Sequence, residues 1–249
     1  MKIQEVLKGP ELDDLTLSEK IQYCKELKEL VLSLPFDEKE AKLCEERYLT
    51  LLDICLPIFK TIFRPNINFH TTELPKGPNI VICNHLDSYD QIPLSCAVPK
   101  LPLHYMIAES FEGTLKGQQY KKLGAFVVDR NSGEGKRLGY IEALKYLFRG
   151  FSVALMPEGH RWIVYGSDGT VQKFHSGFAS MAQLTGANVI PNAINNDFRI
   201  GKLYVNRGVP FKINLEDKVI DKTNESHQIV TDLWQENRNK GALIRTKKR

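Results

Sequence analysis

Residues 79–90 of the chain, NIVICNHLDSYD, join a short apolar run to a polar turn. The run at 80–83 is rich in β-branched residues and shorter than an ordinary helix, which predicts a buried strand. Similar runs recur along the chain and are separated by stretches with helical periodicity. The runs lie at 105–108, 125–128, 153–156 and 189–191, and the helical stretches lie near 88–98, 114–122, 135–148 and 175–186. This alternation predicts an α/β domain over residues 67–249, with a largely parallel central sheet flanked by helices.

The segments on either side of this alternation complete the predicted architecture. Residues 202–206 and 210–213 predict two more strands, close enough to form an antiparallel edge, and residues 225–240 predict a closing helix. Residues 1–66 predict a small N-terminal helical subdomain, whose two helices are separated at Pro35.

The most apolar stretch of the chain, residues 48–63, allows two interpretations. It is interrupted by Asp53, Pro57 and Lys60, and it is shorter than the roughly 18 apolar residues of a membrane span. One interpretation is a buried core helix kinked at Pro57. The other is an interfacial helix that rests on a bilayer, with Lys60 and Arg64 at the level of the headgroups.

The composition excludes several classes of protein. With 42% hydrophobic and 26% charged residues among 249, the chain has the composition of a globular protein and not of a disordered one. Its net charge of +4 is too small to predict a nucleic-acid partner, but it is compatible with an anionic membrane surface or a phosphorylated substrate. The five cysteines contain no Cys-x-x-Cys pair, which argues against a disulfide framework and a thiolate zinc site. We therefore expect a reducing, cytoplasmic location, and the N-terminus shows no secretory signal.

The turn after the first apolar run carries the most reactive pair of side chains, His85 and Asp90. Active sites in α/β proteins are built where strands end. The two residues are about 140° apart on a regular helix, so they can meet only if His85 lies in the turn and Asp90 in the first helical turn. Asp87 or Ser88 would then be the N-cap. Asp90 would accept a hydrogen bond from one ring nitrogen of His85 and leave the other as a general base. Alternatively, the polar residues only cap a helix and His85 has no chemical role.

Three further segments combine an apolar run with polar residues that could do chemistry. They are Gly124-Ala-Phe-Val-Val-Asp-Arg130, Met156-Pro-Glu-Gly-His-Arg161 and the pair Ile190-Pro191. Taken singly, each has an ordinary structural explanation: a surface ion pair, a Pro/Gly turn and an edge strand, respectively.

In this order and spacing, the four segments resemble the four motif blocks of the glycerolipid acyltransferase family, whose best-known members are the 1-acylglycerol-3-phosphate acyltransferases. The resemblance covers about residues 75–215. The matching residues, block by block, are Asn84, His85 and Asp90; Gly124, Phe126 and Arg130; Pro157, Glu158, Gly159 and Arg161; and Ile190 and Pro191. The chain departs from the family pattern at His160, where the family has Thr, and Trp162 follows the Arg. This departure implies a different shape or polarity near the acceptor.

The resemblance implies transfer of an acyl group from a thioester, acyl-CoA or acyl carrier protein, to a glycerophosphate hydroxyl. The expected acceptor is 1-acylglycerol-3-phosphate and the product phosphatidate. An alcohol is a poor nucleophile, so a base must take its proton; His85 suits this role, assisted by Asp90. The sequence has no Gly-x-Ser-x-Gly elbow, which favours direct transfer over an acyl-enzyme. We expect no bound cofactor and no metal ion.

The remaining motif residues are implied to bind the acceptor. Arg130 and Arg161 would hold its phosphate, because guanidinium groups match phosphate oxygens. Glu158 would bond an acceptor hydroxyl or orient an Arg, and Gly159 would let backbone N–H groups approach the ligand. Because such acceptors reside in membranes, we expect peripheral attachment to the cytoplasmic face of a membrane.

Other functions also fit parts of the pattern. The acceptor could be another lysophospholipid or glycerol-3-phosphate. A metal-dependent hydrolase could use the side chains that follow the strands, namely His85, Asp87, Asp90, Glu158 and His160. A non-enzymatic lipid-binding protein is a third candidate, although binding alone requires no His85–Asp90 pair.

Overall fold

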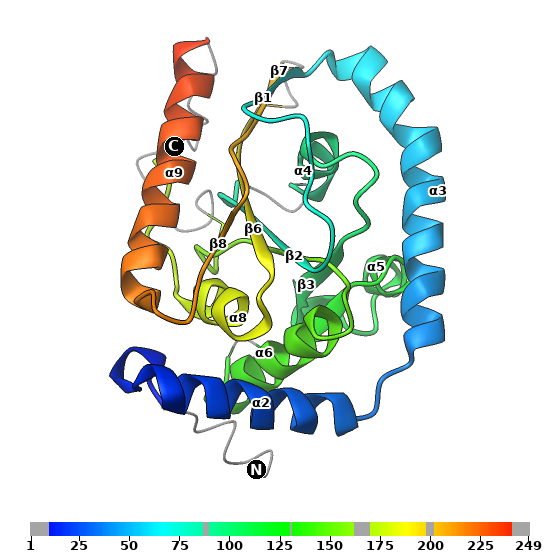
Figure 1. Ribbon diagram of the computed structural model, residues 1–249. Helices are drawn as coiled ribbons and strands as arrows, with labels where there is room; N and C mark the ends of the chain where they lie inside the picture. Colours follow the sequence, from blue (N-terminus) through cyan, green and yellow to red (C-terminus); the bar gives the residue numbers. More distant parts are fainter. Residues whose placement is uncertain (1–9, 87–89, 130, 162–169, 198–201, 241–249) are drawn as a thin grey trace.

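A computed structural model of the chain describes residues 10–86, 90–129, 131–161, 170–197 and 202–240, and its centre is an eight-stranded sheet (Figure 1). In chain order the strands are β1 (Asn66–Phe69), β2 (Asn79–Cys83), β3 (His104–Ala108), β4 (Phe126–Val128), β5 (Val153–Leu155), β6 (Asn188–Asp197), β7 (Lys202–Arg207) and β8 (Phe211–Lys212). Their order across the sheet is β1-β7-β6-β2-β5-β3-β4, with β8 beside β6. Parallel pairing joins β6, β2, β5, β3 and β4, which confirms the predicted α/β class.

Helices cover both faces of the sheet (Figure 1). They are α2 (Leu17–Ser33), α3 (Glu38–Phe63), α4 (Gln91–Ala97), α5 (Leu115–Lys122), α6 (Gly133–Leu147), α8 (Gly177–Thr185) and α9 (Val219–Asn239), with short 3-10 turns at Leu12–Asp14 and Glu109–Phe111. Alternate residues of β2 point to opposite faces, as the pleat requires. Ile80 and Ile82 enter the core under α2, α6, α8 and α9, whereas Val81 and Cys83 enter the core under α3 and α4.

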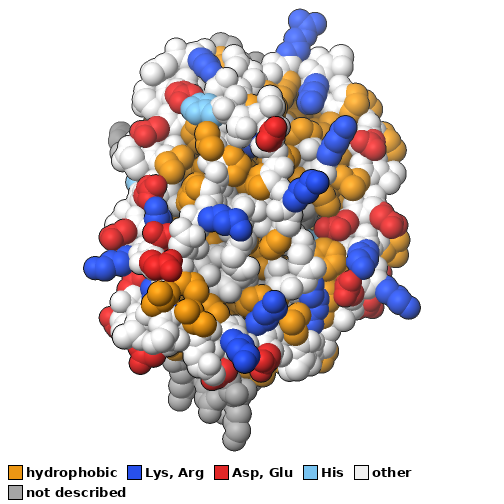
Figure 2. Space-filling view, viewed as in Figure 1, with side chains coloured by type: hydrophobic (Ala, Val, Ile, Leu, Met, Phe, Trp, Pro, Cys, Tyr) orange, Lys and Arg blue, Asp and Glu red, His pale blue; other side chains and the backbone are white. Residues whose placement is uncertain are grey.

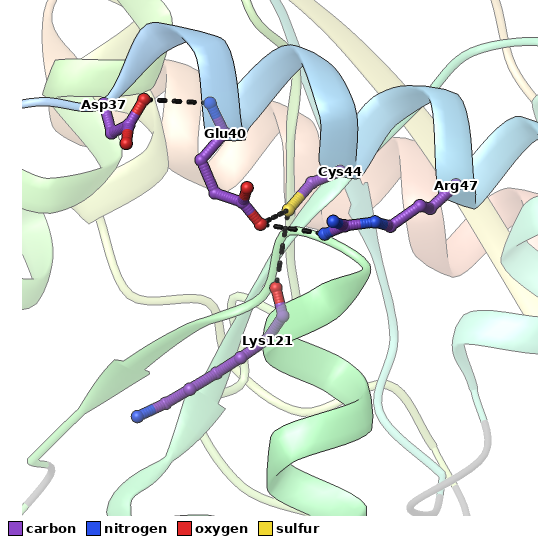
Figure 3. Close-up of polar contacts among 5 residues, drawn as sticks. All are labelled: Asp37, Glu40, Cys44, Arg47 and Lys121. Atoms are coloured by element: carbon purple, nitrogen blue, oxygen red, sulfur yellow. Dashed lines mark hydrogen bonds and ion pairs between the residues drawn. The ribbon is translucent and has the colours of Figure 1, made fainter.

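The first half of α3 carries a group of polar contacts near its N-terminus, one of which reaches α5 (Figure 3). Asp37 caps the helix by accepting a hydrogen bond from the backbone N–H of Glu40 at 2.9 Å. The Glu40 carboxylate accepts from Arg47 at 2.8 Å and lies 3.6 Å from the thiol of Cys44. The same thiol lies 3.6 Å from the carbonyl oxygen of Lys121, in the last turn of α5.

The second half of α3 presents apolar side chains to solvent. Tyr48 is buried and shares a 2.8 Å hydrogen bond with Ser95, but the outward residues over about the next four turns are exposed. Four such residues are between 41% and 65% exposed: Leu51, Ile54, Ile58 and Ile62. The core-helix interpretation of 48–63 is therefore wrong for this face, and the helix runs through Pro57 without a break. Within the described part of the chain, we find no helix with the length and apolarity needed to cross a membrane.

Two predictions about the sheet are wrong. The strands at the C-terminal end do not pair with each other as an antiparallel edge; β7 and β8 each pair antiparallel with β6. The edge beside β7 is β1, a strand that the sequence analysis missed and that pairs with β7 in parallel. Pro191 is also not on an edge strand, because β6 lies between β7 and β2. Its carbonyl accepts a hydrogen bond from Gly208 at 2.9 Å.

Candidate active site

The turns that follow β2 and β5 lie side by side. The two strands are parallel neighbours, with Ile82 opposite Leu155. Leu155 is the last residue of β5, and Ile82 is the last but one of β2. The carboxyl ends of adjacent parallel strands therefore bring the turn at His85 next to the turn at Glu158. This is the usual position of a site in an open α/β sheet.

His85 and Asp90 meet as predicted. His85 Nδ1 lies 2.7 Å from Asp90 Oδ2, and the same oxygen accepts a hydrogen bond from the backbone N–H of Leu86 at 2.7 Å. Asp90 is fully buried, whereas the His85 side chain is 15% exposed. Because Nδ1 faces a carboxylate oxygen, it carries the proton, and the lone pair of the neutral ring is on Nε2. A base with one nitrogen held and the other directed elsewhere is the arrangement that proton transfer from a substrate needs.

The helix start in this region differs from the prediction. Helix α4 begins at Gln91 with Asp90 at its N-cap position, so neither Asp87 nor Ser88 has that position. The Asp90 side chain makes no capping hydrogen bond, since its Oδ2 faces back toward His85 and Leu86. Asp87 and Ser88 themselves lie outside the described residues.

Glu158 lies in a tight turn directly after β5. The turn is closed by a 3.0 Å hydrogen bond from the backbone N–H of Gly159 to the carbonyl of Met156. Gly159 has φ +74°, and a Cβ there would lie 3.1 Å from the ring of His175, so a side chain is disfavoured on both counts. The glycine therefore allows the chain to turn sharply while Glu158 points into the protein.

Glu158 is a buried carboxyl group with an altered acidity. It is 1% exposed, and within the described part of the chain neither of its oxygens has a partner in hydrogen-bonding geometry. Burial raises its pKa to about 8; the backbone N–H groups of His85 and Gln172, which are near enough to act electrostatically, lower the pKa, and the charge of Asp90 raises it. Glu158 is therefore mostly protonated at neutral pH.

The second motif block is largely structural. Gly124 has φ +87°, and a Cβ there would lie 2.5 Å from Nδ1 of His104, which donates a 2.9 Å hydrogen bond to the Gly124 carbonyl. Phe126 is buried and stacks on Tyr146 at 5.5 Å between ring centroids. These residues shape the core next to β3 and do not face the His85 turn. Arg130, the residue of this block expected to bind phosphate, lies outside the described residues.

The third block is divided between the interior and the surface. Pro157 and Glu158 are buried, Gly159 and Arg161 are exposed, and His160 is half-buried. Arg161 is thus exposed in the same segment that buries Glu158. Trp162 lies outside the described residues.

Two other chemistries are less well supported by this arrangement. Cys83, next to the His85 turn, is fully buried, and burial together with the charges of Asp90 and Glu158 raises the pKa of its thiol well above the ordinary value. It is therefore unsuited to act as a thiolate nucleophile. Among the described residues, which do not include Asp87, no three His, Cys, Asp or Glu side chains are placed to share a metal ion.

Sequence reasoning missed two contacts at this site: the hydrogen bond from Leu86 N–H to Asp90, and a pair of bonds between the Asn84 side chain and Ile194. Both involve main-chain groups, which have no residue-specific signal in a sequence. The motif position of Asn84 was the available hint, but it indicated no partner.

Comparison with known proteins gives three consistent results. A family model described as "Acyltransferase" matches residues 66–195. A 1-acyl-sn-glycerol-3-phosphate acyltransferase of Borreliella burgdorferi is 25% identical over 149 residues; the match covers 57% of this chain and 56% of that protein, so the chain spans little more than half the length of this relative. The crystal structure of the 1-acyl-sn-glycerophosphate (LPA) acyltransferase PlsC from Thermotoga maritima matches with a TM-score of 0.60 and 19% identity, over 87% of this chain and 88% of that one.

Proposed function

Because the chain belongs to the acyltransferase family, whose model matches more than half of it, we propose that it is an O-acyltransferase acting on a glycerophosphate-type acceptor. The proposed acceptor is 1-acylglycerol-3-phosphate, the product is phosphatidate, and the donor is an acyl thioester, either acyl-CoA or acyl carrier protein. The observation that carries the proposal is the 2.7 Å hydrogen bond between His85 and Asp90 at the end of β2, beside the turn that holds Glu158.

In the proposed reaction, His85 Nε2 takes the proton of the acceptor hydroxyl while the hydroxyl oxygen attacks the thioester carbonyl. The new C–O bond forms, the C–S bond breaks, and the departing thiolate takes the proton back from the imidazolium. Asp90 fixes the ring through Nδ1 and stabilises its positive charge while it exists. General-base assistance of this kind typically contributes about 10²- to 10⁴-fold in rate.

Glu158 contributes a neutral carboxyl group. A carboxylate in this buried position could have oriented an arginine, but a protonated carboxyl has an O–H to donate and a carbonyl oxygen that accepts. Of the two roles that the sequence left open, its raised pKa of about 8 favours a hydrogen bond with an uncharged group of the acceptor, such as a hydroxyl. Arg161, exposed on the same turn, is then the residue we assign to the acceptor phosphate, together with Arg130.

The outward face of α3 is the proposed membrane contact. Its exposed apolar residues recur at intervals of three or four and so form one stripe along the helix, with Lys60 and Arg64 near its C-terminal end. Figure 2 shows apolar side chains at the surface along the side where α3 runs, mixed with basic and acidic ones. Apolar insertion combined with attraction to anionic headgroups is how interfacial helices bind. We propose that the protein is attached peripherally to the cytoplasmic face of a membrane.

A thiol-release assay tests the proposed function directly. Each donor, acyl-CoA or acyl carrier protein, is tested with each of three kinds of acceptor: 1-acylglycerol-3-phosphate, glycerol-3-phosphate and other lysophospholipids. If the acyl group is transferred to one of the others and not to 1-acylglycerol-3-phosphate, the proposed acceptor is wrong. We expect His85→Ala to lose about 10²- to 10⁴-fold in rate while the protein remains folded, and Asp90→Asn to lower mainly kcat. If His85→Ala keeps activity within a few-fold of the unaltered protein, the general-base mechanism is wrong.

A further inference from the structure

Asn84 connects the end of β2 to β6 through its side chain. Residue pairing between the two strands ends with Cys83 opposite Asn192. Beyond that point, Asn84 Nδ2 donates to the Ile194 carbonyl at 2.9 Å, and the Ile194 backbone N–H donates to Asn84 Oδ1 at 2.8 Å. Asn84 is 2% exposed and Ile194 is fully buried. The carboxamide therefore makes to Ile194 the two hydrogen bonds that the main chain of β2 would make if the strand continued.

The bonds from the Asn84 side chain free the main chain that follows. Because the carboxamide already bonds the N–H and C=O groups of Ile194, the backbone after Asn84 can leave the sheet at once. The backbone N–H of His85 then faces the Glu158 carboxyl, and that of Leu86 donates to Asp90. Without the carboxamide, either the Ile194 N–H and C=O would remain buried without partners or the main chain would have to pair further along β6. One more paired residue would displace the turn by about 3.3 Å and separate Leu86 from Asp90.

We propose that Asn84 is a positioning residue for the His85–Asp90 pair, because its carboxamide replaces the next step of the β2–β6 ladder and thereby fixes where the chain leaves the sheet. Asn84 itself takes no part in proton transfer. The inference rests on the proposed function in one respect, since it takes His85 as the base of the reaction.

The same strand supplies a matched control. Asn79, at the opposite end of β2, is 1% exposed and also makes polar contacts on both sides of its carboxamide. Its Nδ2 donates to the carbonyl of Gly77 at 2.8 Å and to Ser152 at 3.1 Å, and its Oδ1 accepts from Asn188 at 3.1 Å. Five strand residues place it about 17 Å from Asn84. Asn79→Ala therefore removes a comparable buried amide without reaching the site.

The test compares Asn84→Ala with Asn79→Ala at a temperature where both are folded. Both should unfold at lower temperature than the unaltered protein. Only Asn84→Ala should lower kcat, by roughly 10- to 100-fold, because a small displacement of a reacting group has effects of this size. If Asn84→Ala does not fold, Asn84→Ser, which keeps one hydrogen-bonding group, should show the same changes to a smaller extent.

Proton NMR gives a readout that does not depend on turnover. The Nδ1–H of His85, held by Asp90, should give a low-field resonance that is absent in His85→Ala. We expect this resonance to persist in Asn79→Ala and to shift or broaden in Asn84→Ala or Asn84→Ser. If the Asn84 variants keep both this resonance and their kcat, like Asn79→Ala, the positioning role is refuted. If the unaltered protein transfers no acyl group, the proposed function fails, and the resonance alone still decides the role of Asn84.

Discussion

Replacing Glu158 with Gln should change how the stability of the protein depends on pH. At pH values below 4.5, the Glu158 carboxyl is protonated in both the native and the unfolded chain, and its contribution to stability is fully present. Above that pH the unfolded chain ionises, whereas the native carboxyl stays protonated until pH about 8. The native state then loses about 1.4 kcal/mol for each pH unit, on the order of 5 kcal/mol across the window. Gln has nearly the same shape and does not titrate, so Glu158→Gln should not show this loss.

Urea denaturation between pH 5 and pH 8 measures the effect. The free energy of unfolding of Glu158→Gln, compared with that of the unaltered protein, should be similar near pH 5 and become greater by several kcal/mol at pH 8. Glu112→Gln is the matched control, because the Glu112 side chain is 63% exposed and its removal should leave the pH dependence unchanged. A difference between Glu158→Gln and the unaltered protein that stays within about 0.5 kcal/mol over the whole range would show that Glu158 is not protonated in the native state.

Two further predictions concern the binding surfaces. Arg161→Ala should raise the KM for the acceptor roughly 10- to 100-fold and leave the donor KM nearly unchanged, with partial rescue by Lys, since a hydrogen bond to a charged group contributes about 1.5–3 kcal/mol. If neither Arg161→Ala nor Arg130→Ala changes the acceptor KM, both arginines have only a structural role. Reversing charge at the end of α3, with Lys60→Glu and Arg64→Glu, should weaken co-sedimentation with anionic vesicles, because each basic residue near the surface contributes about 1 kcal/mol. Activity on a soluble short-chain acceptor should persist; Lys28→Glu on α2 is the control, and an equal loss of binding there would show that α3 is not the contact.

The parts of the fold that the sequence predicted are those encoded by local pattern. Strands β2 to β6 each contain an apolar run, and in β2 and β5 every residue is buried. The strand β1 gave no such run, since its four residues alternate polar and apolar and none is fully buried. The partners of β7 and β8 depend on which strand lies beside β6 in space, and short sequence separation wrongly suggested that they pair with each other.

The candidate site shows the same division between local and distant determinants. The contact of His85 with Asp90 could be predicted because both residues lie in one strand-to-helix turn, where spacing restricts the geometry. The burial of Glu158 could not, because it depends on the packing of β5 beside β2 and on the segment that contains Gln172. The bonds between Asn84 and Ile194 join residues 110 positions apart and satisfy main-chain groups, so no pattern within either segment indicates them.

The two carboxyl groups beside His85 are placed to have opposite charge states. Asp90 receives two hydrogen bonds at one oxygen, from His85 and from the Leu86 backbone, and donors of this kind favour the ionised form. Glu158 is equally buried, but within the described residues its oxygens have no partner in hydrogen-bonding geometry. The nearby N–H groups of His85 and Gln172 lower its pKa by less than burial raises it, so the carboxyl stays neutral near pH 7. If both were ionised, their repulsion would add to the burial of two charges in one site. If Asp90 were the neutral one, the imidazolium formed during proton transfer would have no counter-charge at Nδ1. The direct hydrogen bonds of Asp90 therefore separate the carboxyl group that supports the proposed base from the neutral one that we propose bonds an uncharged group of the acceptor.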